Sequence, residues 1–214
     1  MPVIPWWALL SSGCAPFVLI GGWTVAAILQ PTRYNPVSQT ISTLASYGAT
    51  DRWVMTGALL VLGACHLVSA IGLRPAAPAG RAVLAFGGFA CVAVAMFPEP
   101  DSGSTVQHTA ATTIGFIALA LWPSMAARRG AAWPWPLRTT PAIAVTALLF
   151  GGAIWFLDVL HHHGPIGASE RVLTTAQAVW PLVVALACVS SAARRRAERG
   201  QSAERAADQT APKE

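Results

Sequence analysis

Residues 140–163 read TPAIAVTALLFGGAIWFLDVLHHH, a long apolar run that ends in one aspartate and three histidines. An α-helix of about 20 apolar residues, with a rise of about 1.5 Å per residue, spans the hydrocarbon core of a bilayer. The run contains no charged residue before Asp158. It therefore predicts a transmembrane helix whose polar end lies where the helix meets water.

The same pattern recurs along the chain. Apolar blocks long enough to span a bilayer occur six times, at residues 5–29, 53–73, 79–97, 106–127, 140–161 and 172–193. The 214 residues are 54% hydrophobic and 11% charged, whereas a soluble domain carries about 25% charged residues. None of the blocks has the polar face that a helix of a soluble bundle requires. We therefore predict an all-α integral membrane protein, with a six-transmembrane-helix bundle as one domain over residues 1–193.

Lysine and arginine are distributed unevenly between the blocks. Eleven of them lie in segments on the same side as the two termini, and three lie on the opposite side. Because basic residues are retained in the cytoplasm, this distribution predicts a multi-pass protein of the cell membrane (inner or plasma) with both termini cytoplasmic. Residues 194–214 are polar and lack aromatic side chains, which predicts a disordered basic cytoplasmic tail. The net charge of +5 reflects this topology and does not indicate nucleic-acid binding.

The first extracytoplasmic segment, YNPVSQTISTLASYG at residues 34–48, carries the signals of a short helix. Asn35 is a good N-cap. Apolar residues spaced i, i+4, i+7 and i+8 from Val37 form one stripe, and serines that include Ser38 and Ser42 form a stripe beside it. We therefore predict a short amphipathic helix. Its serines face either a polar cluster at the mouth of the bundle or the solvent, in which case the helix only shields the bundle end.

Polar and ionisable residues collect in the three extracytoplasmic segments. We predict that ten of them form a pocket for a lipid head group or small amphiphile: Asn35, Ser38, Ser42, Asp101, His108, Asp158, His161, His162, Glu170 and Arg171. An unpaired charge in the membrane costs about 3 kcal/mol. His161 and His162, at i+3 and i+4, can therefore partner Asp158. Arg171 either forms a structural ion pair or presents its guanidinium to a phosphate or carboxylate head group.

Imidazole and carboxylate groups are also zinc ligands, so a divalent-metal site is an alternative. Its candidate ligands are His108, His161, His163, Asp101 and Asp158. Consecutive histidines argue against this site, because at most two of them can point the same way. No cofactor is therefore expected, and interfacial polar residues, with or without a lipid contact, are the preferred interpretation. His66, alone in the second block, is interpreted as a buried histidine hydrogen-bonded to a neighbouring helix.

Three motifs, taken in order, resemble the domain-of-unknown-function 998 family of six-span bacterial and archaeal membrane proteins. They are NPVSQTISTLASYG at 35–48, MFPEPDSGSTVQH at 96–108 and GASERVLTTAQAVWP at 167–181. The resemblance covers about residues 10–193 and implies a six-span fold without implying an activity. Such proteins often read Ser-Asp-Leu where this chain reads Ser42-Thr43-Leu44, so one carboxylate is missing. A fainter similarity to Frag1/DRAM/Sfk1-type membrane proteins is associated with lipid organisation.

These observations favour a membrane protein that binds a lipid head group or small amphiphile. One alternative is a metal-dependent hydrolase of lipid amides or esters, in which the metal candidates hold zinc and activate water while Ser38 or Ser42 assists. The other is a structural subunit of a membrane complex. Pairs of small residues such as Gly87-Gly88 permit close helix contacts within or between chains. The expected partners are membrane lipid and a small amphiphilic ligand, and the sequence leaves open both enzymatic activity and oligomeric state.

Overall fold

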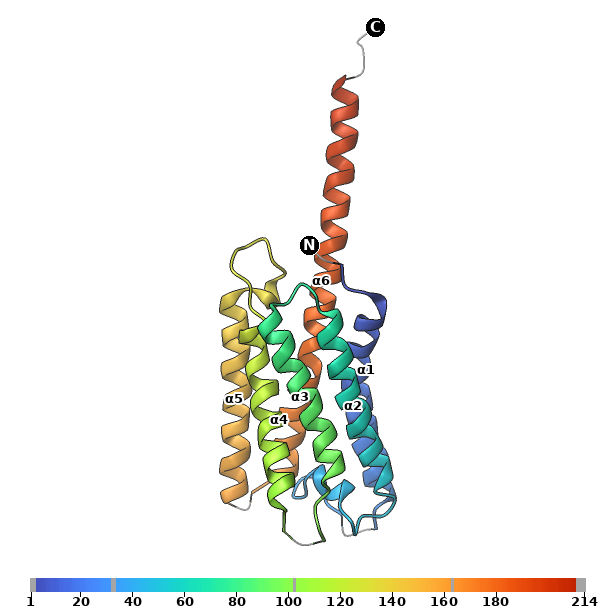
Figure 1. The fold of residues 1–214 in the computed structure, drawn as a ribbon, viewed down its shortest axis with the longest axis vertical. Helices are drawn as coiled ribbons and strands as arrows, with labels where there is room; N and C mark the ends of the chain where they lie inside the picture. Colours follow the sequence, from blue (N-terminus) through green and yellow to red (C-terminus); the bar gives the residue numbers. More distant parts are fainter. Residues whose placement is uncertain (1–2, 32–33, 102, 163, 211–214) are drawn as a thin grey trace.

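The computed structural model describes residues 3–31, 34–101, 103–162 and 164–210. In the described residues, long α-helices run up and down through one bundle (Figure 1). They are α1 Trp6–Leu29, α2 Trp53–Gly72, α3 Pro78–Met96, α4 Val106–Met125, α5 Thr139–His161 and α6 Ile166–Thr210. Helices that follow one another in the chain pack together, and α6 also packs on α1, which closes the bundle.

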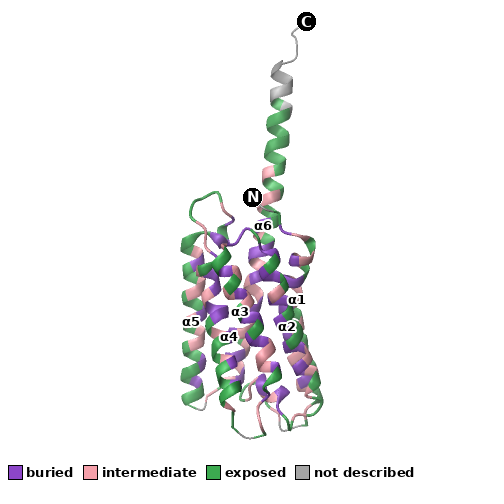
Figure 2. Cartoon of the chain, in the orientation of Figure 1, coloured by how far each residue is buried: buried purple, intermediate pink, exposed green. Residues whose placement is uncertain are grey.

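Five of the helices, α1, α2, α3, α5 and α6, are long and apolar enough to cross a membrane. α4 is 20 residues long and lies between α3 and α5 (Figure 1). Its first half carries Gln107, His108 and several threonines, which lower its hydropathy. Exposed residues are found along the helices of the bundle (Figure 2). Among them are large apolar side chains such as Phe17, Ile28 and Leu148. The predicted helical membrane bundle is confirmed.

Both ends of the chain lie at the same end of the bundle, which we call the terminal end (Figure 1). The connections α2–α3 and α4–α5 also lie there, and α6 extends beyond the bundle. The connections α1–α2, α3–α4 and α5–α6 lie at the opposite end, which we call the loop end. The segments predicted to be extracytoplasmic therefore share one end of the molecule.

The α1–α2 connection, which we call loop 1, does not form the predicted amphipathic helix. Its only helical element among the described residues is a 3₁₀ helix, Ser42–Ala45. The Asn35 side chain caps a local turn by accepting a hydrogen bond from the Val37 N–H at 2.9 Å. Later backbone groups bond to other segments, as the Tyr47 N–H does to the Glu99 carbonyl at 3.1 Å. Tertiary partners therefore replace the hydrogen bonds that a helix would make.

The predicted disorder of the C-terminal tail also differs from the structure, in which α6 continues as one helix to Thr210 (Figure 1). Residues 192–207 consist mainly of alanine, arginine, glutamate and glutamine, all strong helix formers. A polar composition predicts that a segment has no hydrophobic core. It does not prevent a helix, because helical backbone hydrogen bonds form within the segment. Residues 211–214 lie outside the described residues.

A candidate ligand site at the loop end

Arg171, in the first turns of α6, anchors loop 1 to the bundle. Its Nη1 donates to the carbonyls of Pro36 at 2.8 Å and Gln39 at 3.0 Å. The same nitrogen donates to the Gly167 carbonyl at 3.0 Å, and Nη2 donates to the Tyr34 hydroxyl at 2.5 Å. Three backbone carbonyls and one phenol oxygen thus accept hydrogen bonds from this guanidinium. The structure therefore gives Arg171 a role in holding loop 1, and the predicted ion pair is not formed among the described residues.

Glu170, the neighbour of Arg171, is only 5% exposed. Its Oε2 accepts a hydrogen bond from the Ile41 N–H at 2.5 Å. One turn earlier, Gly167 lies so close to loop 1 that an added Cβ would be 2.0 Å from the Gln39 carbonyl oxygen. Loop 1 is thus pressed against the start of α6, with Ile41 and the next residue, Ser42, turned into the bundle.

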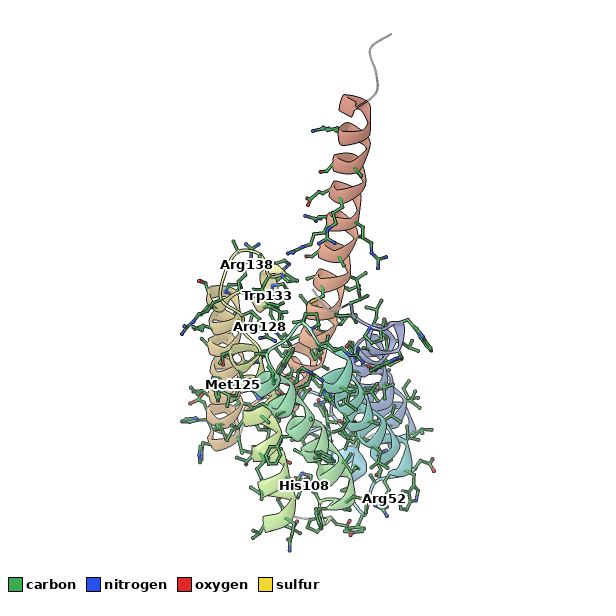
Figure 3. All side chains as sticks on the ribbon, turned by 45° about the horizontal axis from the view of Figure 1, so that its top comes forward. Arg52, His108, Met125, Arg128, Trp133 and Arg138 are labelled. Carbon is green, nitrogen blue, oxygen red and sulfur yellow. The ribbon has the colours of Figure 1, made fainter. Side chains whose placement is uncertain are left out.

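His108 is the centre of a buried polar cluster at the loop end (Figure 3). Its Nδ1 lies 2.8 Å from the Phe97 carbonyl, and its Nε2 lies 3.1 Å from the Ser42 Oγ and 3.3 Å from the Glu99 Oε1. Because a carbonyl can only accept, Nδ1 carries a proton. Nε2 then accepts the Ser42 proton when the ring is neutral, or pairs with Glu99 when it is protonated.

Glu99 is the site residue that the sequence prediction missed, since Asp101 was chosen from the same segment. Burial raises the pKa of Glu99, although the nearby His108 charge and a hydrogen bond from Ser104 oppose the effect. Asp101 is exposed, and its carboxylate packs against Gly48 on the surface of loop 1. One sequence feature could have pointed to Glu99, namely its position between Pro98 and Pro100. A residue that precedes a proline favours an extended backbone.

A cavity of about 310 Å³, which we call the side cavity, lies between α4, α5 and α6 beside this cluster. Its polar lining includes Glu99, His108, Ser42 and Glu170. Its apolar lining is Phe116, Phe156, Leu157, Leu160 and Ile166. The Phe116 and Phe156 rings meet edge to face with centroids 5.4 Å apart. Within the described part of the chain, neither lysine nor arginine lines this cavity.

A second cavity of about 70 Å³, the central chamber, adjoins the side cavity and shares Ser42, Thr112, Phe116 and Glu170 with it. His66 of α2 lines the chamber and is 1% exposed. Among the described residues, neither of its ring nitrogens has a hydrogen-bond partner, nor does the Thr112 hydroxyl. The predicted hydrogen bond from His66 to a neighbouring helix is therefore wrong. Buried polar groups are rarely left unpaired, so the chamber suits water molecules or a polar group of a ligand.

The remaining predicted residues do not join the buried cluster. Asp158 and His162 pair at 3.3 Å, but their side chains are 65% and 75% exposed. At the loop end of α5 the buried residues are Phe156 and Val159, whereas Asp158 and His161 are exposed. Neither side chain therefore takes part in the buried cluster around His108. Two further members of the predicted pocket are exposed on loop 1, namely Asn35 and Ser38.

The metal hypothesis gains no support from the geometry. In the described ranges, no three side chains of histidine, cysteine, aspartate or glutamate come together as metal ligands. His163, one of the five candidate ligands, lies outside the described residues. The arrangement around His108 is instead a hydrogen-bonded cluster of one imidazole, one hydroxyl and one carboxylate beside an apolar cavity.

A bundle of long apolar helices that exposes large apolar side chains on its outward faces is a helical membrane protein. Residues 13–187 match the sequence model of a family described as protein of unknown function (DUF998), and the chain belongs to this family. A search of curated proteins found no match, and a search of solved structures found none either.

Proposed function

We propose that this membrane protein binds an amphiphile in the side cavity. The head group lies beside Glu99 and His108, and the hydrocarbon chain lies against Phe116 and Phe156. The observation that carries the proposal is the pairing of two largely buried carboxyl groups with an apolar wall in one cavity. A volume of about 310 Å³ is in the range of small-molecule sites, which start at about 300 Å³.

The charges around the side cavity favour a particular head group. Glu99 and Glu170 line it, and the nearby Arg171 is engaged by loop 1. An anionic head group would therefore meet carboxylates without a compensating cation, which is costly in a region of low dielectric constant. An ammonium or hydroxyl head group instead donates hydrogen bonds to these carboxylates. The ligand class we propose is an amphiphile with an amine or hydroxyl head group and no net negative charge.

Single-chain amphiphiles test this preference directly. Added to the purified protein in a neutral detergent, sphingosine is expected to raise the melting temperature most, monoolein less and oleic acid least. Glu99→Gln is expected to remove the advantage of sphingosine over monoolein, because it removes the charge that the ammonium group meets. Asp158→Asn is the matched control, since this carboxylate lies at the same end but is 65% exposed. Equal stabilisation by oleic acid and sphingosine would contradict the proposal.

The stabilisation of the protein by sphingosine should also depend on pH, in a direction that Glu99 determines. The pKa of Glu99 is raised by burial, so this carboxyl becomes neutral at a higher pH than an exposed one does. Stabilisation by sphingosine should be complete above that raised pKa and should decrease as the pH falls through it. The Glu99→Gln variant should lose the contribution of Glu99 to this step, and Glu170 is then the carboxyl group that remains in the lining.

We also propose that the loop end faces away from the cytoplasm. Supporting this orientation, eleven of the fourteen lysine and arginine residues belong to the terminal-end segments. A C-terminal fluorescent-protein fusion is expected to fluoresce, and a C-terminal alkaline phosphatase fusion is expected to be inactive in a bacterial host. The opposite pair of results would reverse the orientation.

A further inference from the structure

A third cavity, of mixed character, lies at the terminal end of the bundle, away from the ligand site. It has a volume of about 730 Å³ and lies between the α4–α5 connection and one face of α6. The connection contributes residues 131–135 and Arg138. The face of α6 contributes eight residues between positions 183 and 198. We call this cavity the basic groove.

The lining of the basic groove changes in a regular order along α6. Val183 and Leu186 are apolar, Ser190 and Ser191 carry hydroxyls, and the next turn carries arginines. From Val183 to Arg194 the helix rises about 16 Å. A phospholipid lying against this face presents its chain, its glycerol esters and its phosphate in the same order. The groove therefore matches the polarity of a lipid along its length.

The charge of the groove favours an anionic head group. Arg138, Arg194 and Arg195 line it, opposed by Glu198 alone. Guanidinium groups bind phosphate oxygens through strong charge-assisted hydrogen bonds. Trp135 lies at the groove and meets Trp180 edge to face, with ring centroids 5.8 Å apart. Indole rings are common at the depth of lipid head groups.

The wall of the groove is already fixed in position. Arg138 donates to the carbonyls of Trp133 at 3.0 Å and Ala131 at 2.9 Å, and Arg195 donates to the Ala132 carbonyl. Arg128 lies over the Trp133 ring, 5.1 Å from its centroid. Figure 3 shows Arg128, Trp133 and Arg138 together beside α6. A preformed wall lowers the entropic cost of binding. The hydrogen bonds of Arg138 and Arg195 do not use their Nη1 groups, which can still donate to a phosphate, whereas both Nη groups of Arg171 are engaged by their acceptors.

We propose that the basic groove binds one phospholipid with an anionic head group. Its phosphate lies among Arg138, Arg194 and Arg195, and one acyl chain lies along Val183 and Leu186. This site is independent of the amphiphile site at the loop end, which has the opposite charge preference. The two proposals can therefore fail separately.

Native mass spectrometry of the protein in neutral detergent tests the groove. Three probes are titrated in: phosphatidylglycerol, phosphatidylcholine with the same chains, and soluble glycerol phosphate. The wild type is expected to retain one phosphatidylglycerol with about a tenfold preference over phosphatidylcholine, and to retain glycerol phosphate much more weakly. The double variant Arg194→Gln/Arg195→Gln is expected to lose this preference.

The matched control is Arg196→Gln/Arg199→Gln, which removes the same charge from the same helix outside the groove lining. Equal losses in the two double variants would reduce the effect to general electrostatic attraction and overturn the proposal. Glycerol phosphate binding as tightly as phosphatidylglycerol would identify a soluble phosphate ligand and also overturn it. Leu186→Trp provides a second test, because it blocks the chain position and keeps every charge. This variant should weaken lipid binding, and unchanged retention of phosphatidylglycerol would contradict the proposed orientation of the chain.

Discussion

Replacing Arg171 by methionine is expected to destabilise the protein by about 3 kcal/mol, because it leaves four acceptors, three of them in partly buried hydrogen bonds, without their charged donor. The guanidinium of Arg171 donates to three backbone carbonyls and to the Tyr34 hydroxyl. Methionine fills a similar volume but donates no hydrogen bond. The melting temperature in detergent should fall by roughly 6–12 °C, by the scaling for chains of 150–250 residues.

Arg129→Met is the matched control, since Arg129 is exposed at the terminal end. It should leave the melting temperature unchanged. Lysine in place of Arg171 should recover only part of the loss, because one ammonium group cannot match the two nitrogens that the guanidinium uses here. A methionine variant that melts within about 2 °C of the wild type would show that loop 1 does not depend on this arginine.

The membrane fold was predictable because its signal is local. A run of about 20 apolar residues determines a spanning helix whatever its neighbours are, so residues 140–161 were sufficient to predict α5. α4 shows the limit of this reasoning. Its threonines, Gln107 and His108 lower its hydropathy. It still takes its place in the bundle, because His108 and Thr112 face the side cavity and the central chamber while Gln107 is exposed.

The candidate site was predictable only in part. The structure brings Ser42, His108 and Glu170 together in the lining of the side cavity, because each lies at the loop end of the bundle. Asp158 does not join these three residues, because the direction of its side chain depends on the rotation of α5 about its own axis. A helix that is apolar all round carries no pattern that fixes this rotation. Contacts with α4 and α6 turn Phe156 inward and leave Asp158 outside.

Loop 1 is a different case, because its sequence did carry helix signals. Ile41, Leu44 and Ala45 are buried as the predicted stripe requires, while Val37 is 52% exposed. The sequence did not show that Glu170 and Arg171, more than 120 residues later, would bond to the backbone of loop 1. Partners so distant in sequence override local propensity.

Gly167→Ala is expected to have the second large effect, because it acts where α6 meets loop 1. The added Cβ would lie 2.0 Å from the Gln39 carbonyl oxygen and 2.5 Å from that of Pro36. Both atoms belong to the backbone, so they cannot move aside as a flexible side chain could. Either loop 1 shifts or the first turn of α6 unwinds, and such overpacking costs about 1–3 kcal/mol.

Hydrogen exchange measured by mass spectrometry locates this effect. Peptides that cover residues 34–48 should exchange about tenfold faster in the Gly167→Ala variant, which corresponds to about 1.4 kcal/mol of easier local opening. Peptides from α2 and α3 should be unaffected. Gly151→Ala is the matched control, because no atom lies within 4 Å of an added Cβ at this α5 position. It should stabilise the helix by up to about 1 kcal/mol.

The Gly167→Ala variant also tests whether amphiphile binding in the side cavity depends on the packing of loop 1 against α6. Loop 1 carries Ser42, whose Oγ lies 3.1 Å from the Nε2 of His108. If loop 1 shifts, its residues that line the side cavity and the central chamber shift with it. Stabilisation by sphingosine should then decrease together with the protection of residues 34–48 from hydrogen exchange. Faster exchange with unchanged stabilisation would leave the packing argument intact and would place the amphiphile elsewhere. Unchanged exchange would instead show that the first turn of α6 relaxes, because the close approach of Gly167 to loop 1 cannot accept a methyl group without movement.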